Sequence, residues 1–241
     1  MNKLSELINS EQSRLSLNPL NLLLMNTTVP FEKKISCIYR MTFFILGFKD
    51  IMLLMRYQSP ASDLELMINQ HSEEDSQHWH WFLKDLRRLN INDKFGKDVT
   101  QAFAQMWSQD HFPIRNMVYK IMYYLQQYNH PAFRLLIVIV LESGFNTLIE
   151  VMHPVLKKAG MYEKLEFFGQ VHKDAESNHQ AGSYFDTEEH YCELLSLCIN
   201  HLSEAEYLEA KAMVKALFSD LYAMHECFAK PMLESSLISV S

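Results

Sequence analysis

The sequence predicts an all-α protein, a single bundle of about seven helices, from its composition and from the spacing of its apolar residues. Of 241 residues, 48% are hydrophobic and 12% are aromatic, but only 6 are Gly and 7 are Pro. An all-β fold of this length needs a turn about every 8–12 residues, and therefore more Gly and Pro. The apolar content also excludes a disordered chain and is enough for one large hydrophobic core.

The first half of the chain contains four segments with apolar residues at helical spacing. Pro30 begins the first segment, and Ser59-Pro60 ends it. Ser62, with Glu65 three residues later, has the spacing of a capping box at the start of the second. The polar stretch that leads to Gly96 marks a loop before the third. We expect helices over residues 31–57, 62–89, 98–107 and 112–128.

The second half begins after a break at Asn129-His130-Pro131. The unbroken apolar run 135–141 predicts the most deeply buried helix of the chain. Gly182 ends the helix after it, and Ser203 with Glu206 has the spacing of another capping box. We expect helices over residues 132–156, 162–181, 187–202 and 203–229.

No linker or repeat divides the chain. We expect one domain over residues 1–241, with an N-terminal arm or helix (1–30), a core bundle (31–230) and a tail (231–241). The net charge of -7 offers no basic surface, so neither nucleic acid nor a membrane is an expected partner. The apolar runs fall short of the roughly 20 residues that span a bilayer, and no signal peptide is recognisable. With no CxxC pair among the four Cys, we expect a soluble cytoplasmic protein.

The segment 71–80 is the first candidate for a metal site, because it holds three of the 11 His. On a continuous helix, His71, Glu74 and His78 share one face, and Glu73 and His80 share another. An acid and a His one turn apart commonly bind metal in helical bundles. We therefore expect Glu74 and His78 as ligands, with Glu73 and His80 as the alternative pair and His71 beside the ligands.

The segment 172–179 repeats this composition, with His172, Glu176 and His179 on one helical face. Two such segments about a hundred residues apart would bring ligands together from opposing helices. Together with Glu142, described next, the two segments offer three carboxylates and up to four His. Such a set suits two iron or manganese ions better than zinc, which usually recruits thiolate in structural sites.

Glu142 is the third candidate, because it directly follows the apolar run 135–141. A helix that is apolar on all sides is buried, so this carboxylate is expected inside the protein. A buried carboxylate must be neutral, ion-paired or bound to a metal. The alternative to a metal is a structural ion pair with Arg115 or Arg134.

Three features together resemble the haem-oxygenase-like diiron oxidases, which belong to the wider TenA and PqqC superfamily. They are the string EDxxHWxWFLxDL at residues 74–86, the isolated Glu142, and HxxxExxH at residues 172–179. The first string is most similar to the nitrile-forming branch, and the order and spacing resemble the p-aminobenzoate-forming branch. In several members the first helix supplies its acid and its His seven residues apart, which would fit Glu73 and His80.

The resemblance implies a haem-oxygenase-like bundle of about seven helices that binds two Fe(II) ions per chain, or Mn(II), and activates O2. Carried over residue by residue, it gives Glu142 as a bridge between the ions and five further ligands, Glu74, His78, His172, Glu176 and His179. No residue beyond the metal ligands is singled out as catalytic. Haem is not expected, because residues 1–30 contain no His that could serve as its proximal ligand.

Members of this group oxidise small amines, amino acids or fatty acids. The resemblance therefore implies a small amine or amino-acid-like substrate that undergoes N-oxygenation, bond cleavage or nitrile formation. An external electron donor and a homodimer are compatible with it. Aromatic and Met side chains at helical spacing are candidates for the substrate pocket, with plain core packing as the alternative: Tyr39, Phe43, Phe44, Met117, Tyr124 and Phe145.

Two other functions stay open at this point. A metal-free hydrolase of the TenA type would need a Cys nucleophile, for which Cys37 and Cys192 are the candidates. A non-catalytic binding protein of the same fold could use the Glu-rich surface of the last two predicted helices, although such a charge run is usually only a solvated face.

Overall fold

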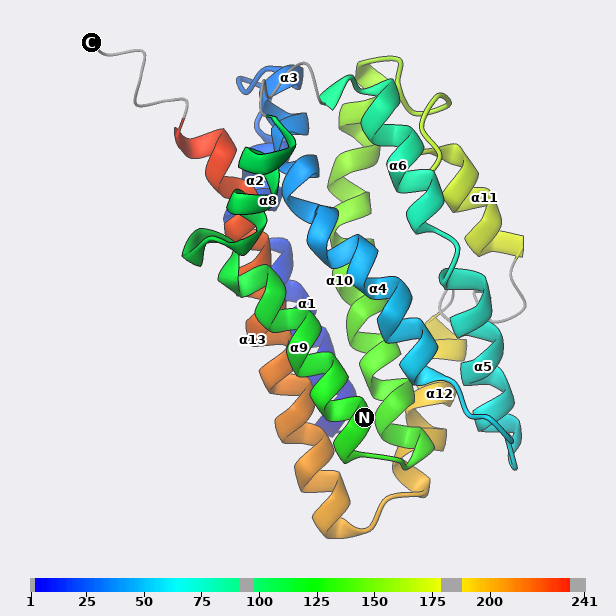
Figure 1. Cartoon of the computed structure of the whole chain (residues 1–241). Helices are drawn as coiled ribbons and strands as arrows, with labels where there is room; N and C mark the ends of the chain where they lie inside the picture. Colours follow the sequence, from blue (N-terminus) through cyan, green and yellow to red (C-terminus); the bar gives the residue numbers. More distant parts are fainter. Residues whose placement is uncertain (1–2, 92–97, 179–187, 235–241) are drawn as a thin grey trace.

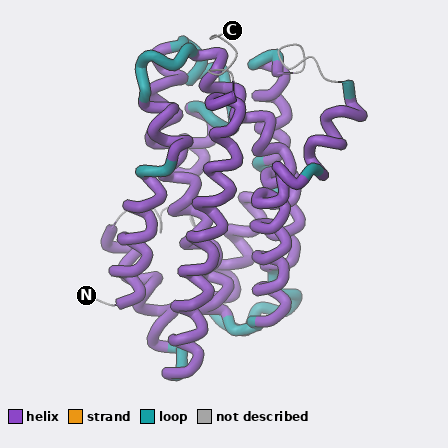
Figure 2. Tube along the Cα trace, turned by 90° about the vertical axis from the view of Figure 1, so that its left-hand side faces the viewer, coloured by secondary structure: helices purple, strands orange, loops and turns teal. Residues whose placement is uncertain are grey.

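The computed structural model describes residues 3–91, 98–178 and 188–234, which form helices joined by turns and loops, without a strand (Figures 1 and 2). This confirms the all-α prediction. The helices of the first half are α1 (Lys3–Ser16), α2 (Pro19–Met25), α3 (Phe31–Lys34), the 3₁₀ helix η1 (Ile35–Met41), α4 (Thr42–Met55), α5 (Asp63–Asp75), α6 (Trp79–Arg88) and α8 (Val99–Trp107). Those of the second half are η2 (Gln109–His111), α9 (Phe112–Gln127), α10 (Pro131–Lys158), α11 (Gln170–Asn178), α12 (Glu188–Asn200) and α13 (Glu204–Glu234).

Helix α10 is the centre of the bundle, because α1, α2, α5, α9, α12 and α13 all contact it (Figure 1). The apolar run 135–141 is buried throughout, as its composition predicts. By length and composition α10 could cross a membrane, but 67% of its apolar window is buried inside the protein. That burial is typical of the core helix of a bundle.

The N-terminal helices α1 and α2 pack within the bundle rather than forming a separate arm. Leu4, Ile8, Leu20 and Leu24 are fully buried, and both helices contact α10 and α13. Asn18 caps α2 by accepting the N–H of Leu20 at 3.0 Å. Residues 3–25 therefore contribute to the same core as the later helices, although the sequence had set the first 30 residues apart.

The predicted helix over residues 62–89 is two helices, α5 and α6, separated at residues 76–78. Its start is as expected, since Ser62 Oγ accepts the N–H of Glu65 at 3.3 Å. At the break, Arg56 donates to the carbonyl of Ser72 and to the hydroxyl of Ser76, both at 3.0 Å. The Ser72 hydroxyl also bonds to the carbonyl one turn earlier, at Ile68. Such competing hydrogen bonds bend and end helices, so continuity was the wrong expectation here.

The predicted helix over residues 162–181 begins only at Gln170. Helix α10 ends at Lys158, and Gly160 follows it with a φ of +64°, the left-handed conformation that favours Gly after a helix. The Met161 N–H then bonds back to the carbonyl of Leu156 at 2.9 Å, which completes a Schellman motif. Residues 161–169 form a turn, in which the N–H groups of residues 166–168 bond to Asp85 on α6 instead of to carbonyls one turn earlier.

Candidate metal centre

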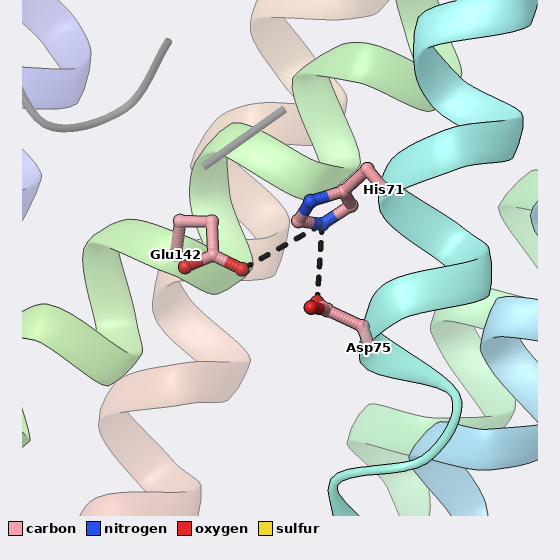
Figure 3. A group of neighbouring side chains, drawn as sticks. All are labelled: His71, Asp75 and Glu142. Carbon is pink, nitrogen blue, oxygen red and sulfur yellow. Dashed lines mark ion pairs between the residues drawn. The ribbon is translucent and has the colours of Figure 1, made fainter. Parts of the chain in front are cut away.

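Three side chains of α5 and α10 form a compact cluster in the interior: His71, Asp75 and Glu142 (Figure 3). The Nε2 atom of His71 lies 3.2 Å from Oδ2 of Asp75 and 3.7 Å from Oε1 of Glu142. One ligand atom from each residue lies within 4.8 Å of those of the other two. The side chains are 6%, 5% and 16% exposed, so water screens their charges only weakly.

Asp75 also faces a second imidazole. Its other oxygen, Oδ1, lies 3.7 Å from Nδ1 of His78, which is the residue just before α6. The His78 ring stacks on Trp81 at 4.5 Å between centroids, and this contact fixes the plane of the imidazole. The two oxygens of one carboxylate are therefore shared between His71 on one side and His78 on the other.

His172, near the start of α11, completes the group of imidazoles around this point. Its ring centroid lies 4.4 Å from that of His78 and 4.9 Å from that of Phe145. Its Nδ1 atom lies 2.8 Å from the backbone carbonyl oxygen of Phe167. A carbonyl only accepts, so Nδ1 carries the ring proton and Nε2 is the ring nitrogen without one.

The carboxylate that the structure brings to this cluster from α5 is Asp75, whereas the sequence reading placed Glu74 there. Glu74 is half-buried, and its Oε1 accepts a hydrogen bond from Gln70 at 3.3 Å. The Glu74–His78 pairing assumed a continuous helix, but α5 ends at Asp75. His71, which was expected beside the ligands, lies within the cluster.

The alternative pair Glu73 and His80 faces away from the cluster. Both side chains are exposed, and Glu73 forms an ion pair with Arg56. Of the residues expected on α11, the side chain of Glu176 and the whole of His179 lie outside the described residues.

A spacing that both segments share could have identified Asp75 from the sequence. His71, Asp75 and His78 follow the pattern HxxxDxxH, and residues 172–179 follow HxxxExxH, with the same i, i+4, i+7 spacing. An alignment of His71 with His172 therefore pairs Asp75, and not Glu74, with Glu176.

The two Arg residues considered as ion-pair partners of Glu142 bind elsewhere. Arg115 donates to the backbone carbonyls of Met106 and Ser108. Arg134 donates to the carbonyls of Leu54 and Met55, at the end of α4. The structural ion pair with either Arg is therefore not formed, and Glu142 lies beside His71 instead.

A cavity of about 90 Å³ adjoins the cluster, and Asp75, His78, Glu142 and His172 all line it. Most of the remaining lining is apolar and includes six Phe side chains, Phe44, Phe48, Phe145, Phe167, Phe168 and Phe228. An apolar wall of this kind excludes bulk water and strengthens electrostatic interactions inside the cavity.

Two further polar residues line the cavity outside the cluster. Lys49, which is exposed on α4, lies over the ring of Trp79 at 5.6 Å. His225, on α13, is only 3% exposed, and its buried Nδ1 has no hydrogen-bond partner among the described residues. Burial lowers the pKa of His225 to about 4, so its ring is neutral near pH 7. Neither residue had a local signal in the sequence.

Of the six residues expected to line a substrate pocket, Phe44 and Phe145 line this cavity. The other four lie elsewhere. Met117 is fully buried in the core, and Phe43 packs edge-on against Trp107 and Tyr119. The Tyr39 hydroxyl bonds to Gln105 at 3.0 Å, and the Tyr124 ring lies 6.1 Å from that of Tyr128.

The two Cys whose side chains are described have the properties of buried structural thiols. Burial raises the pKa of Cys37 to about 12 and raises that of Cys227 above its ordinary value. A nucleophilic Cys needs a lowered pKa and access to substrate. Cys37 therefore does not suit the nucleophile of a TenA-type hydrolase; the side chain of Cys192 lies outside the described residues.

Comparison with known proteins adds no family to this geometry. No protein-family model matches the chain, and a search of curated proteins finds no match.

Proposed function

We propose that this chain is a non-haem diiron oxidase or oxygenase with a haem-oxygenase-like bundle, which uses O2 to oxidise a small amine or amino-acid-like molecule in the cytoplasm. The observation that supports it best is the position of Asp75 between two imidazoles, next to Glu142 and beside a largely apolar cavity. The repeated pattern HxxxDxxH and HxxxExxH is a second support, because it supplies similar ligand sets from two helices.

The donor set fits a pair of iron or manganese ions. Ligands about 2.1 Å from one octahedral ion lie about 3 Å apart when adjacent and about 4.2 Å apart when opposite. The separations of 3.2 Å and 3.7 Å around His71 Nε2 fall within that range. His71, Asp75 and Glu142, with His78 and His172 beside them, would hold the ions. Iron bound there would supply the redox chemistry that activates O2.

The side chains around the cluster support an amphipathic substrate. The Phe-rich wall would bind its apolar part and keep water from the reacting atoms. Lys49 is the only Lys or Arg among the described residues that line the cavity, and it would attract a carboxylate at the rim. The neutral ring of His225 would offer the substrate a hydrogen bond from inside the cavity.

Metal analysis after anaerobic loading tests the proposal. We expect about two Fe(II) per wild-type chain and a transient visible absorption band on mixing with O2. Glu142→Gln should lower the iron content, because the amide is a weaker ligand than the carboxylate. Glu150→Gln is the matched control, since Glu150 is exposed on the same helix, and it should load like wild type. A wild-type chain that binds neither Fe(II) nor Mn(II) at micromolar concentration would overturn the proposal.

A further inference from the structure

The backbone segment 166–168 is held from one side by a single buried carboxylate, that of Asp85 on α6. Asp85 is fully buried. Its Oδ1 accepts the N–H of Glu166 at 2.7 Å, and its Oδ2 accepts the N–H groups of Phe167 and Phe168 at 2.9 and 3.0 Å. Hydrogen bonds from amides to a carboxylate are among the strong ones in proteins. Asp85 therefore fixes the orientation of three consecutive peptide groups.

The same peptide segment holds His172 from its other side. The carbonyl of Glu166 accepts the backbone N–H of His172 at 3.0 Å, and the carbonyl of Phe167 accepts Nδ1–H of its ring at 2.8 Å. In the peptide group that joins Glu166 to Phe167, the N–H donates to Asp85 and the carbonyl accepts from the backbone of His172. In the next peptide group, the N–H of Phe168 donates to Asp85 and the carbonyl of Phe167 accepts from the His172 ring. Hydrogen bonds linked in this way polarise and strengthen one another.

Packing around the segment leaves it little freedom to move. The ring of Phe82, one turn before Asp85 on α6, contacts the rings of Phe167 and Phe168 at 5.6 and 6.1 Å. At the end of the segment, a Cβ on Gly169 would lie 2.2 Å and 2.3 Å from the carbonyl oxygens of Tyr162 and Leu165. The turn is thus closed on itself and attached to α6 by both polar and apolar contacts.

We propose that Asp85 is a positioning residue for His172: through the peptide groups of residues 166–168 it fixes the ring orientation and keeps the ring proton on Nδ1. Nε2 is then the ring nitrogen that carries no proton and can coordinate a metal ion. The consequence for metal binding rests on the proposed function, but the state of the His172 ring does not, because it is set by the protein alone.

Nitrogen-15 NMR of the imidazole rings in the metal-free protein tests this directly. At about pH 8.5 a neutral imidazole carries a single ring proton, and the chemical shifts of its two nitrogens report which one carries it. We expect His172 to be protonated on Nδ1 alone in wild type. In Asp85→Asn, an NH₂ group replaces one accepting oxygen, and we expect a mixture of both tautomers.

The matched control is Lys84→Met. Lys84 lies next to Asp85 on α6 and contacts the same segment through an exposed ion pair with Glu166 at 2.7 Å. This variant loosens the outside of the segment and leaves Asp85 in place, so we expect the wild-type His172 signal. A wild-type ring with its proton on Nε2, or an Asp85→Asn ring identical to wild type, would overturn the proposal.

A second measurement needs no variant and covers the case in which Asp85→Asn does not fold. In wild type, scalar couplings across hydrogen bonds should link the amides of Phe167 and Phe168 to the Asp85 carboxyl carbon, and His172 Nδ1 to the Phe167 carbonyl carbon. Loss of either set in the folded protein would contradict the proposal.

Titration with Mn(II) separates this inference from the proposed function. We expect Asp85→Asn to bind Mn(II) at least about 10-fold more weakly than wild type, as is typical when the partner that orients a ligating His is removed. A wild-type protein that binds no Mn(II) but shows the expected tautomers would contradict the proposed function alone. Unchanged tautomers in Asp85→Asn would contradict the role of Asp85 alone.

Discussion

Oδ2 of Asp75 lies 3.2 Å from Nε2 of His71, one helical turn earlier, at the point where α5 ends. His78 follows three residues after Asp75, in the turn that joins α5 to α6, and its backbone N–H bonds to the Asp75 carbonyl. Its Nδ1 lies 3.7 Å from the other oxygen of the same carboxylate. Two imidazoles thus face one carboxylate at the junction of α5 and α6.

The first prediction distinguishes Asp75 from its neighbour Glu74. Asp75→Asn should weaken Mn(II) or Fe(II) binding by at least about 10-fold, because it removes the carboxylate that faces both His71 and His78. Glu74→Gln is the control, because Glu74 accepts a hydrogen bond from Gln70 and the cluster consists of His71, Asp75 and Glu142. Competition with a metallochromic chelator under anaerobic conditions measures both affinities. Tight binding by Asp75→Asn together with weak binding by Glu74→Gln would instead favour the ligand pair that the sequence suggested.

The second prediction concerns Gly169, which no side chain can replace without movement of the backbone. A Cβ there would lie 2.2 Å from the carbonyl oxygen of Tyr162, far inside contact distance. Gly169→Ala should lower the free energy of unfolding by about 3 kcal/mol or more, in the range of overpacked and strained sites. Urea denaturation followed by circular dichroism measures the change.

Gly160→Ala provides the comparison for that experiment. Gly160 has open space around its Cα but a φ of +64°, so Ala there costs only the strain of the left-handed conformation, about 1–2 kcal/mol. Equal losses for the two variants would show that the turn around Gly169 can relax, contrary to its close packing.

The sequence predicts the helices well wherever local chemistry decides them. Ser62 and Ser203 cap their helices as their spacing predicts, and the apolar run 135–141 lies at the centre of the bundle. Distant side chains bond to the backbone at both interruptions that the sequence did not predict. Arg56 donates to the carbonyl of Ser72, which also accepts the Ser76 N–H, and Asp85 accepts the N–H groups of residues 166–168. Neither partner is visible to a method that considers only neighbouring residues.

The candidate site shows the same division. Glu142, His78 and His172 were predicted from burial and spacing, and all three line the cavity beside the cluster. Asp75 was not predicted and His71 was expected only beside the ligands, whereas the structure brings both together with Glu142. No spacing pattern in the sequence singles out His225, so only the packing of α13 against the cavity reveals it.

The third prediction is a dependence of stability on pH that comes from His225. Burial lowers its pKa from 6.5 to about 4 in the folded protein. The unfolded chain therefore binds the proton more tightly, so stability is complete above about pH 6.5 and decreases as the pH falls from there toward 4. The full effect of such a shift is about 3 kcal/mol. His225→Phe removes the group that titrates and should make the decrease smaller.

Urea midpoints at pH 7 and pH 4.5 test this expectation in wild type and His225→Phe. His153, whose pKa burial also lowers to about 4, should leave a residual decrease in the variant. Replacement of the exposed His201 by Gln is the control and should keep the wild-type difference. The same pH dependence in His225→Phe and wild type would assign the effect to other groups.

The last prediction concerns the buried guanidinium of Arg40, which joins η1 to η2 and α13. Its side chain is 2% exposed, and it forms an ion pair with Asp110 and a contact to Cys227 Sγ at 3.3 Å. Burial acts to raise the pKa of Asp110, but hydrogen bonds from Arg40 and Lys230 outweigh it and hold the pKa below its ordinary value. The pair therefore stabilises the fold above about pH 4, and this contribution is lost as Asp110 protonates at lower pH.

Asp110→Asn should destabilise the protein at pH 7, because it leaves the buried charge of Arg40 without its anion. Breaking a fully buried pair costs about 3–5 kcal/mol, and since Asp110 is 40% exposed we expect about 2 kcal/mol. Glu73→Gln is the control, because it removes an ion pair in which Glu73 is 68% exposed, and should cost less than about 1 kcal/mol. The double variant Arg40→Met with Asp110→Asn should recover part of the loss, since no unpaired charge is then buried. An Asp110→Asn protein as stable as Glu73→Gln would mean that water, rather than Asp110, neutralises the charge of Arg40.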